Sequence, residues 1–313
     1  MSLAITYSAF GSPDVLVPTE ITAPPPGPGE IAVRVEAAGV NPLDHKLRSG
    51  ARFSGEITEP RRVGADGAGV VTAVGTDVDG YRVGDAVVVF GATGVYATDV
   101  VVTPAQLTPR PPQVSAAQGA ALGIPAGTAY QSLRSLGVTA GDTLLVHGGS
   151  GAVGQAVIQF ALLWGVTVIA TTSERRAERV RALGAVPVAY GPGLADRVCT
   201  LAPNGVTAAL DIAGTDEALQ TSLDLVADRS RIVTLVRGSD AESLGIRAFM
   251  GGSPRPLSAQ EVAWRAEAMP VVVNLLAAGR FTVEIDVELP LTRAAEAHRL
   301  VEAGAPGKVV LVP

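Results

Sequence analysis

The sequence predicts an α/β fold in which a doubly wound parallel sheet is inserted into a β-barrel domain. Valine-rich short runs between glycine and proline turns fill residues 1–120, strands alternate with helices from about residue 121, and the first pattern returns after about residue 257. Alternating strands and helices are typical of a parallel sheet with right-handed crossovers. We therefore expect residues 1–121 and 259–313 to form one discontinuous domain and residues 122–258 to form the inserted one.

The first part is predicted to be built from short strands. Residues 31–38 (IAVRVEAA) alternate in part between apolar and polar side chains, which is typical of a half-buried strand. Residues 69–74, 85–90 and 99–102 are further β-prone runs between glycine or proline turns. The segment 24–29 (PPPGPG) is a rigid turn. These features predict an all-β, barrel-like domain.

The remaining elements follow from the same patterns. Expected strands are 143–146, 166–171, 186–190, 206–212, 231–236, 282–289 and 308–312, and expected helices are 152–164, 174–183, 219–227, 259–278 and 293–303. The run VTVIAT in the second of these strands is mostly apolar, as expected where a sheet is covered on both faces. Ser173 can cap the helix that follows it, and Gly184 can end that helix.

One loop carries the strongest functional signal. Residues 144–154 read LLVHGGSGAVG, so a short apolar strand runs into the pattern Gly149-x-Gly151-x-x-Gly154, and a helical pattern follows at once. Glycine permits the tight turn, lets the backbone approach phosphates and lets the helix pack closely on the strand. The N-terminus of the helix offers unpaired N–H groups to the phosphates. The loop therefore predicts a dinucleotide pyrophosphate site.

The end of the second strand of this sheet predicts which dinucleotide binds. Sites selective for NAD place an acidic residue there, on the ribose 2′-hydroxyl. This chain has Ser173, then Glu174, Arg175 and Arg176. Hydroxyl and guanidinium groups accept a 2′-phosphate that a carboxylate would repel, while Glu174 falls in the first helical turn, where it can serve the helix dipole. We expect NADPH, bound by Ser173 and Arg176; the alternative is that both arginines belong to a solvated helix face.

Composition limits the class of protein. A formal net charge of −6 argues against nucleic acid as a partner, and no apolar run reaches the ~18–20 residues that span a bilayer. The segment MSLAITYSAF lacks the pattern of a secretory signal. The single cysteine, Cys199, fits a reducing compartment, and three dispersed histidines offer no metal-ligand cluster. We expect a cytoplasmic enzyme that acts on a small-molecule substrate and holds no metal.

Four segments have the residues of a known family. They are AGVNPLD at 38–44 with RSG at 48–50, GADGAGVV at 64–71, the glycine loop, and GKVVL at 307–311. With them the chain resembles the medium-chain dehydrogenase/reductase superfamily over nearly its whole length, in particular the zinc-free quinone oxidoreductase (ζ-crystallin-like) branch. The resemblance implies a Rossmann domain inserted in a GroES-like β-barrel domain. It also implies a homodimer, whose parallel sheets would pair edge to edge near residues 245–250.

A comparison with zinc-dependent relatives sharpens the expected chemistry. Those enzymes have a cysteine ligand where this chain has Asn41, and Gly-His-Glu where it has Gly64-Ala65-Asp66. Without these ligands no tetrahedral site polarises an alcohol oxygen. The resemblance thus implies hydride transfer from NADPH to a quinone or an α,β-unsaturated carbonyl, because conjugation in such acceptors spreads the developing charge.

The resemblance also assigns individual residues. Asn41 is implied to lie near the nicotinamide and substrate, Thr128 near the nicotinamide ring, and Tyr190 beside the adenosine 2′-phosphate. The residues implied to line the pyrophosphate, chiefly through main-chain N–H groups, are Ser150, Gly151, Ala152 and Val153. In the alternative interpretation, Asn41 is a turn residue, Thr128 a helix cap or helix-facing hydroxyl, and Tyr190 a strand-end aromatic at the sheet edge.

The sequence does not determine the substrate class. Related quinone reductases often have aromatic residues just after the Asn-x-x-Asp segment, whereas this chain has His45, Lys46 and Leu47 there. Two alternatives are therefore kept. One is an enoyl-thioester reductase of the same superfamily, and the other is a non-catalytic NADPH-binding sensor or structural protein.

Overall fold

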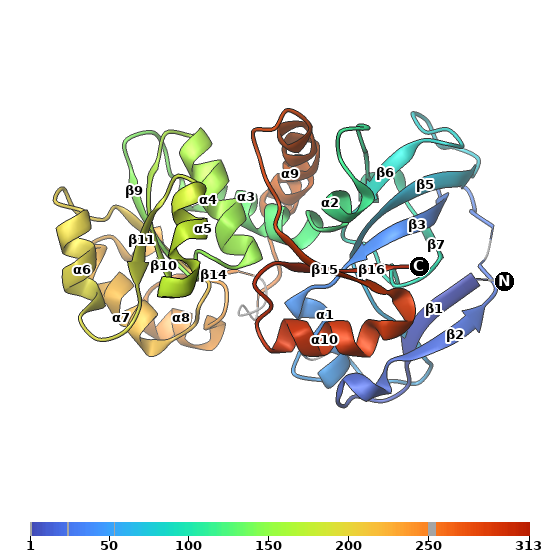
Figure 1. The fold of residues 1–313 in the computed structure, drawn as a ribbon, viewed down its shortest axis with the longest axis horizontal. Helices are drawn as coiled ribbons and strands as arrows, with labels where there is room; N and C mark the ends of the chain where they lie inside the picture. Colours follow the sequence, from blue (N-terminus) through green and yellow to red (C-terminus); the bar gives the residue numbers. More distant parts are fainter. Residues whose placement is uncertain (1, 24, 53, 250–254) are drawn as a thin grey trace. The chain divides into compact units, whose positions relative to one another are not determined.

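The computed structural model describes residues 2–23, 25–52, 54–249 and 255–313, which form two compact units (Figure 1). The first unit comprises Met1–Ile124 and Met269–Pro313, and the second unit comprises Pro125–Ala268. The division falls inside helix α3 (Gly123–Leu136) and inside helix α9 (Ala259–Ala277), rather than after residues 121 and 258. The later half of α9 belongs to the first unit, and it buries Met269, Val272 and Val273.

The first unit is mainly antiparallel β structure. Its seven-stranded sheet has the order β15-β16-β3-β5-β6-β8 with β7 paired to β3, and a three-stranded sheet has the order β2-β1-β4. The strands are β1 (Ser2–Tyr7), β2 (Val17–Ile21), β3 (Ile31–Gly39), β4 (Arg61–Arg62), β5 (Asp66–Val74), β6 (Ala86–Val89), β7 (Asp99–Val102), β8 (Leu107–Pro109), β15 (Ile285–Pro290) and β16 (Lys308–Val312). Among the described strands of this unit, only β15 and β16 pair in parallel. The C-terminal strand therefore completes the sheet begun near the N-terminus.

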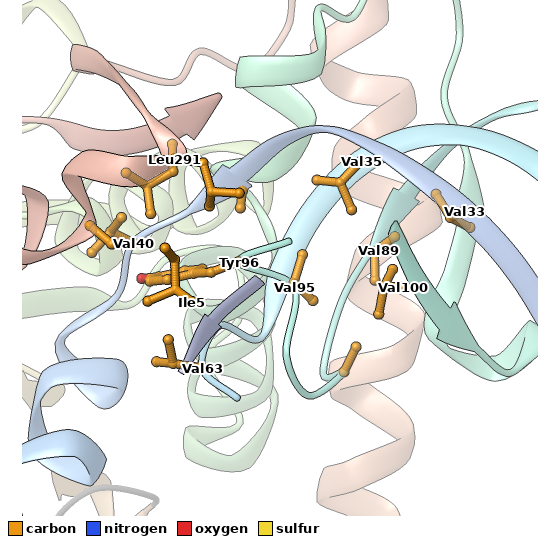
Figure 2. Packing of buried hydrophobic residues seen from close by; sticks show 14 of the residues in the cluster. Ile5, Val33, Val35, Val40, Val63, Val89, Val95, Tyr96, Val100 and Leu291 are labelled. Atoms are coloured by element: carbon orange, nitrogen blue, oxygen red, sulfur yellow. The ribbon is translucent and has the colours of Figure 1, made fainter. Parts of the chain in front are cut away.

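Valine side chains build the core of the first unit. Figure 2 shows Val33 and Val35 of β3 with Val89 and Val100, in a buried cluster that also contains the ring of Tyr96. All five are at most 4% exposed. β-branched side chains fit a pleated, buried surface well, which is why the valine-rich runs form strands here. Three helices lie wholly within the described part of this unit: α1 (Pro42–Ser49), α2 (Ala116–Ala120) and α10 (Ala294–Glu302).

The second unit contains one six-stranded parallel sheet in the order β11-β10-β9-β12-β13-β14. Its strands are β9 (Thr143–His147), β10 (Thr167–Thr172), β11 (Val186–Ala189), β12 (Ala208–Asp211), β13 (Ile232–Thr234) and β14 (Arg247–Ala248). In sequence order this is 3-2-1-4-5-6, the doubly wound arrangement, so the predicted fold class is confirmed. The strand order reverses between β9 and β12, and such sheets bind ligands beyond the carboxyl ends of the strands at this point.

Helices cover both faces of this sheet (Figure 1). Leu145 and Ile169 face the side on which Leu194, Leu219 and Ala241 of three helices pack. The opposite side carries α4 and α5, and α3 joins them where Tyr130 meets Phe160 and Trp164 in edge-on ring contacts. The helices are α4 (Ala152–Leu163), α5 (Ala177–Ala182), α6 (Leu194–Leu201), α7 (Asp216–Leu225) and α8 (Gly238–Leu244). Among the described residues, no helix is both long and apolar enough to cross a membrane.

Two predicted helices have different starts. The helix expected over 174–183 begins as a 3-10 turn, η3 (Glu174–Arg176), before α5. The helix expected over 219–227 begins earlier, at Asp216, because the Thr215 hydroxyl caps it by accepting from the Ala218 main-chain N–H at 3.2 Å.

Candidate functional site

The glycine loop is tied to the second strand of the sheet. The N–H of Gly149 donates to the Thr171 carbonyl at 2.9 Å, and that of Gly148 donates to the Thr171 hydroxyl at 3.1 Å. Gln155 closes the other side, because its Nε2 donates to the Ser150 carbonyl at 2.9 Å. The turn between β9 and α4 is therefore held in shape by the protein alone.

The space available for a side chain differs among the three glycines of the pattern. A Cβ on Gly149 would lie 2.6 Å from the Ala170 Cβ, and a Cβ on Gly154 would lie 2.7 Å from the Gly149 Cα. A Cβ on Gly151 would meet only the Gly148 carbonyl oxygen, at an ordinary 3.6 Å. Packing therefore requires the first and third glycines, whereas the described protein atoms leave room for a side chain at Gly151. Close approach of a ligand to the backbone explains a glycine at that position.

Gly151 also begins helix α4. It is the N-cap, with φ −75° and ψ 166°, and it supplies no side-chain cap. The N–H groups of Ala152 and Val153 lie in the first helical turn, where no earlier carbonyl of the helix can accept from them. This end of the helix carries a partial positive charge. Ser150, Gly151, Ala152 and Val153 thus form one continuous stretch that can hold a phosphate.

Ser173 and Arg176 lie beside this stretch. Arg176 Nη2 donates to the Ser150 carbonyl at 3.4 Å, so the loop after β10 contacts the loop after β9. Ser173 is the N-cap of η3, but its side chain makes no capping hydrogen bond. Glu174 and Arg175 are exposed, whereas Ser173 and Arg176 are half-buried. Of the pair that the sequence predicts for a 2′-phosphate, Arg176 therefore contacts the glycine loop, and Ser173 is half-buried beside it.

Tyr190 lies at the same edge of the sheet. It follows the last residue of β11, and Ala189 pairs in parallel with Thr172, which precedes Ser173. Neighbouring strands lie about 4.8 Å apart, so Tyr190 and Ser173 leave the sheet side by side. The Tyr190 side chain is 62% exposed. Its ring is thus not a buried part of the core, and it is available to a ligand.

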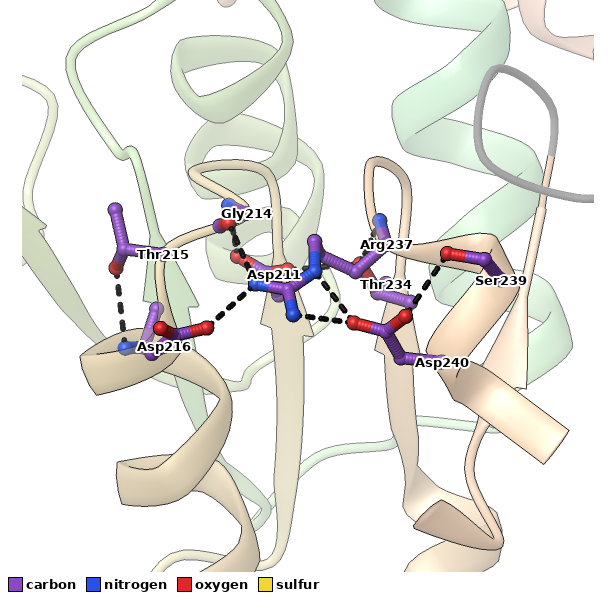
Figure 3. A network of polar contacts seen from close by, with 9 residues as sticks. Asp211, Gly214, Thr215, Asp216, Thr234, Arg237, Ser239 and Asp240 are labelled. Atoms are coloured by element: carbon purple, nitrogen blue, oxygen red, sulfur yellow. Dashed lines mark hydrogen bonds and ion pairs between the residues drawn. The ribbon is translucent and has the colours of Figure 1, made fainter. Parts of the chain in front are cut away.

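A buried carboxylate fixes the loops on the other side of the switch point (Figure 3). Asp211 ends β12 and is 0% exposed. Its Oδ1 accepts from the main-chain N–H groups of Ala213 at 3.0 Å and Gly214 at 2.8 Å, and its Oδ2 accepts from the Thr234 hydroxyl at 2.8 Å. These bonds hold the end of β12 to the end of β13. Sequence reasoning missed this residue, although an acidic side chain at the end of an apolar strand was a usable signal.

Arg237 joins the two loops at the surface (Figure 3). Its Nε donates to Asp240 at 2.6 Å, and its Nη1 donates to Asp216 at 2.7 Å. The Asp216 side chain is 94% exposed. Exposed ion pairs contribute little stability each, so the shape of this region depends more on Asp211 than on Arg237.

His147 is a structural residue at the end of β9. It is 1% exposed, and its Nε2 lies 3.1 Å from the Ser222 hydroxyl. Burial lowers the pKa of His147 to about 4, although the charge of Asp211 opposes the shift. The imidazole is therefore neutral near pH 7, and it cannot supply a proton there.

In the first unit, Asn41 is the centre of a buried polar cluster. It lies between β3 and α1 and is 1% exposed. Its Nδ2 donates to Asp66 Oδ2 at 2.9 Å, its Oδ1 accepts from Lys308 Nζ at 2.7 Å, and its main-chain N–H donates to Asp44 at 2.8 Å. Both ends of the carboxamide already have charged partners, which fix its orientation.

Two carboxylates and one ammonium group share this cluster. Burial raises the pKa of Asp44 to about 7 and lowers the pKa of Lys308. The Tyr96 hydroxyl donates to Asp44 at 2.9 Å, and its pKa is raised well above the usual value, first by burial. Asp66 Oδ2 also accepts from the Ile124 main-chain N–H, at 2.7 Å, at the start of α3. The cluster thus joins the starts of α1, β5, β16 and α3.

The residues at this place differ from the usual ligands of zinc. Zinc takes cysteine, histidine or carboxylate ligands in a tetrahedral arrangement. Asn41 and Ala65 supply none, Asp66 is bonded to Asn41, and the Lys308 ammonium lies within the cluster. Across the part of the chain that the structure describes, no group of three His, Cys, Asp or Glu side chains is placed to hold a metal.

Thr128 lies on α3 in the second unit and is 6% exposed. Its hydroxyl oxygen accepts a short hydrogen bond from Arg265 Nη2 on α9. Because guanidinium only donates, the hydroxyl proton of Thr128 stays available for donation to a ligand. Sequence reasoning did not identify Arg265, since nothing in the pattern of α9 marks this residue.

Comparisons with known proteins agree with these features. The family model of the alcohol dehydrogenase GroES-like domain matches residues 27–112, and that of the zinc-binding dehydrogenases matches residues 183–311. A quinone oxidoreductase of Pseudomonas aeruginosa is 31% identical, with 100% of both chains covered. The structure of Escherichia coli quinone oxidoreductase complexed with NADPH has a TM-score of 0.84 at 26% identity, covering 99% of this chain and 100% of that one.

A second similar structure has a different description. It is an NAD-dependent alcohol dehydrogenase, 31% identical, with a TM-score of 0.84 and 99% of both chains covered. Fold likeness alone therefore does not decide between the two nicotinamide cofactors. The full-length match to the Pseudomonas enzyme, together with both family models, places this chain in the quinone oxidoreductase (ζ-crystallin-like) branch of the medium-chain dehydrogenase/reductase superfamily, a family of oxidoreductases.

Proposed function

We propose that this protein is a zinc-independent reductase that transfers a hydride from NADPH to a quinone or an α,β-unsaturated carbonyl compound. The observation that carries the proposal is the space at Gly151. The described protein atoms do not require a glycine there, while its two partner glycines are required by packing. A dinucleotide pyrophosphate lying against Gly151 and the start of α4 supplies the missing reason.

The choice of NADPH rests on the edge next to the glycine loop. Ser173 and Arg176 offer a hydroxyl and a guanidinium where an NAD site would offer a carboxylate. Arg176 reaches the Ser150 carbonyl, and the exposed Glu174 carries its charge in solvent. Tyr190 adds an aromatic face at the same edge. Together they favour a cofactor with a 2′-phosphate.

Independence of zinc is supported by the cluster around Asn41. The positive charge that a metal would bring is already present as Lys308, 2.7 Å from the Asn41 Oδ1. A conjugated acceptor fits such a site. Its conjugation spreads the negative charge left by hydride addition, so no Lewis acid is needed to stabilise that charge. NADPH, when bound, supplies the hydride.

The chain's own residues would bind the cofactor, orient the reacting groups and donate hydrogen bonds to the substrate. The first-turn N–H groups of Ala152 and Val153 would hold the pyrophosphate. Thr128, whose oxygen is fixed by Arg265, can donate its proton in a hydrogen bond to a developing oxyanion. For Asn41 we propose a positioning role at the reacting end, because its amide is held by Lys308 and Asp66.

Turnover against an electrophile panel tests the proposal. Loss of reduced-nicotinamide absorbance should follow addition of a quinone or enone, and NADPH should be used in preference to NADH. Activity confined to crotonyl-type thioesters would instead identify an enoyl-thioester reductase. NADPH binding without turnover on any acceptor would favour the sensor or structural role, and it would contradict the proposal.

We also propose a homodimer of a cytoplasmic enzyme. The support is that β14 is an outer strand of the parallel sheet among the described strands, so its outer side can pair with a second copy about a twofold axis. Of the segment predicted to make this contact, residues 245–249 are described and Met250 lies outside the described residues. Analytical ultracentrifugation should give twice the 31.8 kDa chain mass, and a monomer at micromolar concentration would refute the dimer.

A further inference from the structure

The segment around Tyr190 is bound by one guanidinium group. Arg197, on helix α6, donates from Nε and Nη2 to the Ala189 carbonyl at 3.2 and 2.8 Å, from Nη2 to the Gly191 carbonyl at 2.8 Å, and from Nη1 to the Pro192 carbonyl at 2.7 Å. The three carbonyls lie on both sides of Tyr190. A single side chain therefore fixes the main chain immediately before and after this residue.

A second helix, α7, also holds this segment. Glu217 Oε2 accepts from the Gly191 main-chain N–H at 2.7 Å. Arg197 thus binds the carbonyl side of the segment, and Glu217 binds its N–H side. Hydrogen bonds to charged groups are roughly twice as strong as neutral ones, so this is a firm attachment for a surface loop.

The attachment does not serve the burial of Tyr190. The ring is 62% exposed, so an apolar contribution to the core does not explain why its backbone is held so closely. What the attachment does achieve is a fixed main chain at the residue that carries this aromatic ring, beside Ser173 on the adjacent strand end. A loop whose main chain is held in place before a ligand arrives loses less conformational entropy on binding.

We infer that Arg197 and Glu217 are positioning residues that hold Tyr190 ready to pack against the adenosine end of the dinucleotide. This inference rests on the proposed function. Arg197 acts through the loop geometry and not as a direct ligand of the phosphate, because its guanidinium is engaged by three main-chain carbonyls.

A double-mutant cycle on cofactor affinity tests the inference. The dissociation constant for NADPH is measured by fluorescence for the wild type, Tyr190→Ala, Arg197→Ala and the double variant. Loss of a stacked aromatic should weaken binding about tenfold, and Arg197→Ala should weaken it several-fold. In the Tyr190→Ala background, the Arg197 substitution should add less than about a twofold change, because coupled residues are non-additive.

Other variants distinguish an effect of Arg197 on the position of Tyr190 from an effect of its charge on NADPH affinity, and from an effect on folding. Arg181→Ala removes the same charge from α5, where Arg181 is 59% exposed and paired with Glu178, and its NADPH affinity should match the wild type. Arg197→Lys should recover only part of the affinity, since a compact ammonium with three N–H donors cannot reproduce the four hydrogen bonds made by the planar guanidinium. If Arg197→Ala does not fold, Glu217→Ala carries the same cycle with Tyr190→Ala.

Three results would overturn the inference. They are additive effects in the cycle, which would make Arg197 an independent electrostatic contributor; a Tyr190→Ala variant with wild-type affinity; and an Arg181→Ala loss equal to that of Arg197→Ala. Failure of the wild type to bind either NADPH or NADH would refute the proposed function as well. Binding by the wild type with an additive cycle would refute only the positioning role.

Discussion

Two glycines only three positions apart should respond to substitution in opposite ways. Gly154→Ala places a Cβ 2.7 Å from the Gly149 Cα and 2.8 Å from its carbonyl carbon, and the Gly148 carbonyl oxygen lies closer still. The helix or the turn must shift, at a cost of about 1–3 kcal/mol. For a domain of this size that corresponds to a decrease in Tm of roughly 2–12 °C.

Gly151→Ser should leave stability unchanged and weaken cofactor binding. The new Cβ makes only an ordinary 3.6 Å contact inside the protein, and serine at an N-cap is favoured over glycine by a few tenths of a kcal/mol. The same side chain would meet the pyrophosphate. If that clash costs about 1–3 kcal/mol, the dissociation constant for NADPH rises roughly 5- to 150-fold.

Differential scanning calorimetry and fluorescence titration measure both effects on the same samples. The expected pattern is a lower Tm for Gly154→Ala and a higher dissociation constant at unchanged Tm for Gly151→Ser. A Gly151→Ser variant that binds NADPH as tightly as the wild type would refute the assignment of the pyrophosphate to this turn. Equal loss of Tm in both variants would refute the distinction between packing and ligand access.

Three further predictions concern the cofactor edge and the buried polar groups. Arg176→Ala should weaken NADPH binding far more than NADH binding, while the exposed Arg175→Ala should change neither; equal loss for both cofactors would sink the 2′-phosphate assignment. Lys308→Met leaves the buried Asp66 without its nearby cation, so the free energy of unfolding should fall by about 3–5 kcal/mol; a fall below about 1 kcal/mol in urea denaturation would contradict the account of the cluster. Burial lowers the pKa of His298 to about 3, so the unfolded chain, with a histidine pKa near its usual ~6.5, binds more protons as pH falls from about 6.5 toward 3, and stability drops over that range. His298→Leu should remove this loss of stability at low pH, which is on the order of 3 kcal/mol at pH 4. If the free energy of unfolding of the variant falls between pH 7 and pH 4 by as much as that of the wild type, the prediction is refuted.

The fold could be predicted from the sequence because its signals are local. Strands β3 and β9 and helices α4 and α9 all begin within one residue of their predicted starts, since alternation, short apolar runs and helical spacing are all patterns of neighbouring residues. Strands β1 and β2 and helix α1 were missed. The segment of α1 contains Asp44 and Arg48, which are buried through polar contacts rather than through an apolar stripe, so no hydrophobic period marks it.

The site was predictable only where main-chain geometry determines it. The glycine pattern and the Ser173–Arg176 segment have a fixed relation to the strand ends, so their sequence position predicts their place. Lys308 and Asp66 are far apart in the chain and meet at Asn41 through the pairing of β16 with β3 and of β3 with β5. Such partners depend on tertiary pairing, and no local pattern shows them.

The most direct test follows the hydride itself. Protein freed of metal by a chelator is supplied with NADPH carrying deuterium at the reactive carbon of the nicotinamide, together with an α,β-unsaturated ketone. We predict turnover without added zinc, with the deuterium bonded to carbon in the reduced product by mass spectrometry. Turnover that appears only when zinc is restored, or a product that carries no deuterium when either face of the nicotinamide is labelled, would contradict the account.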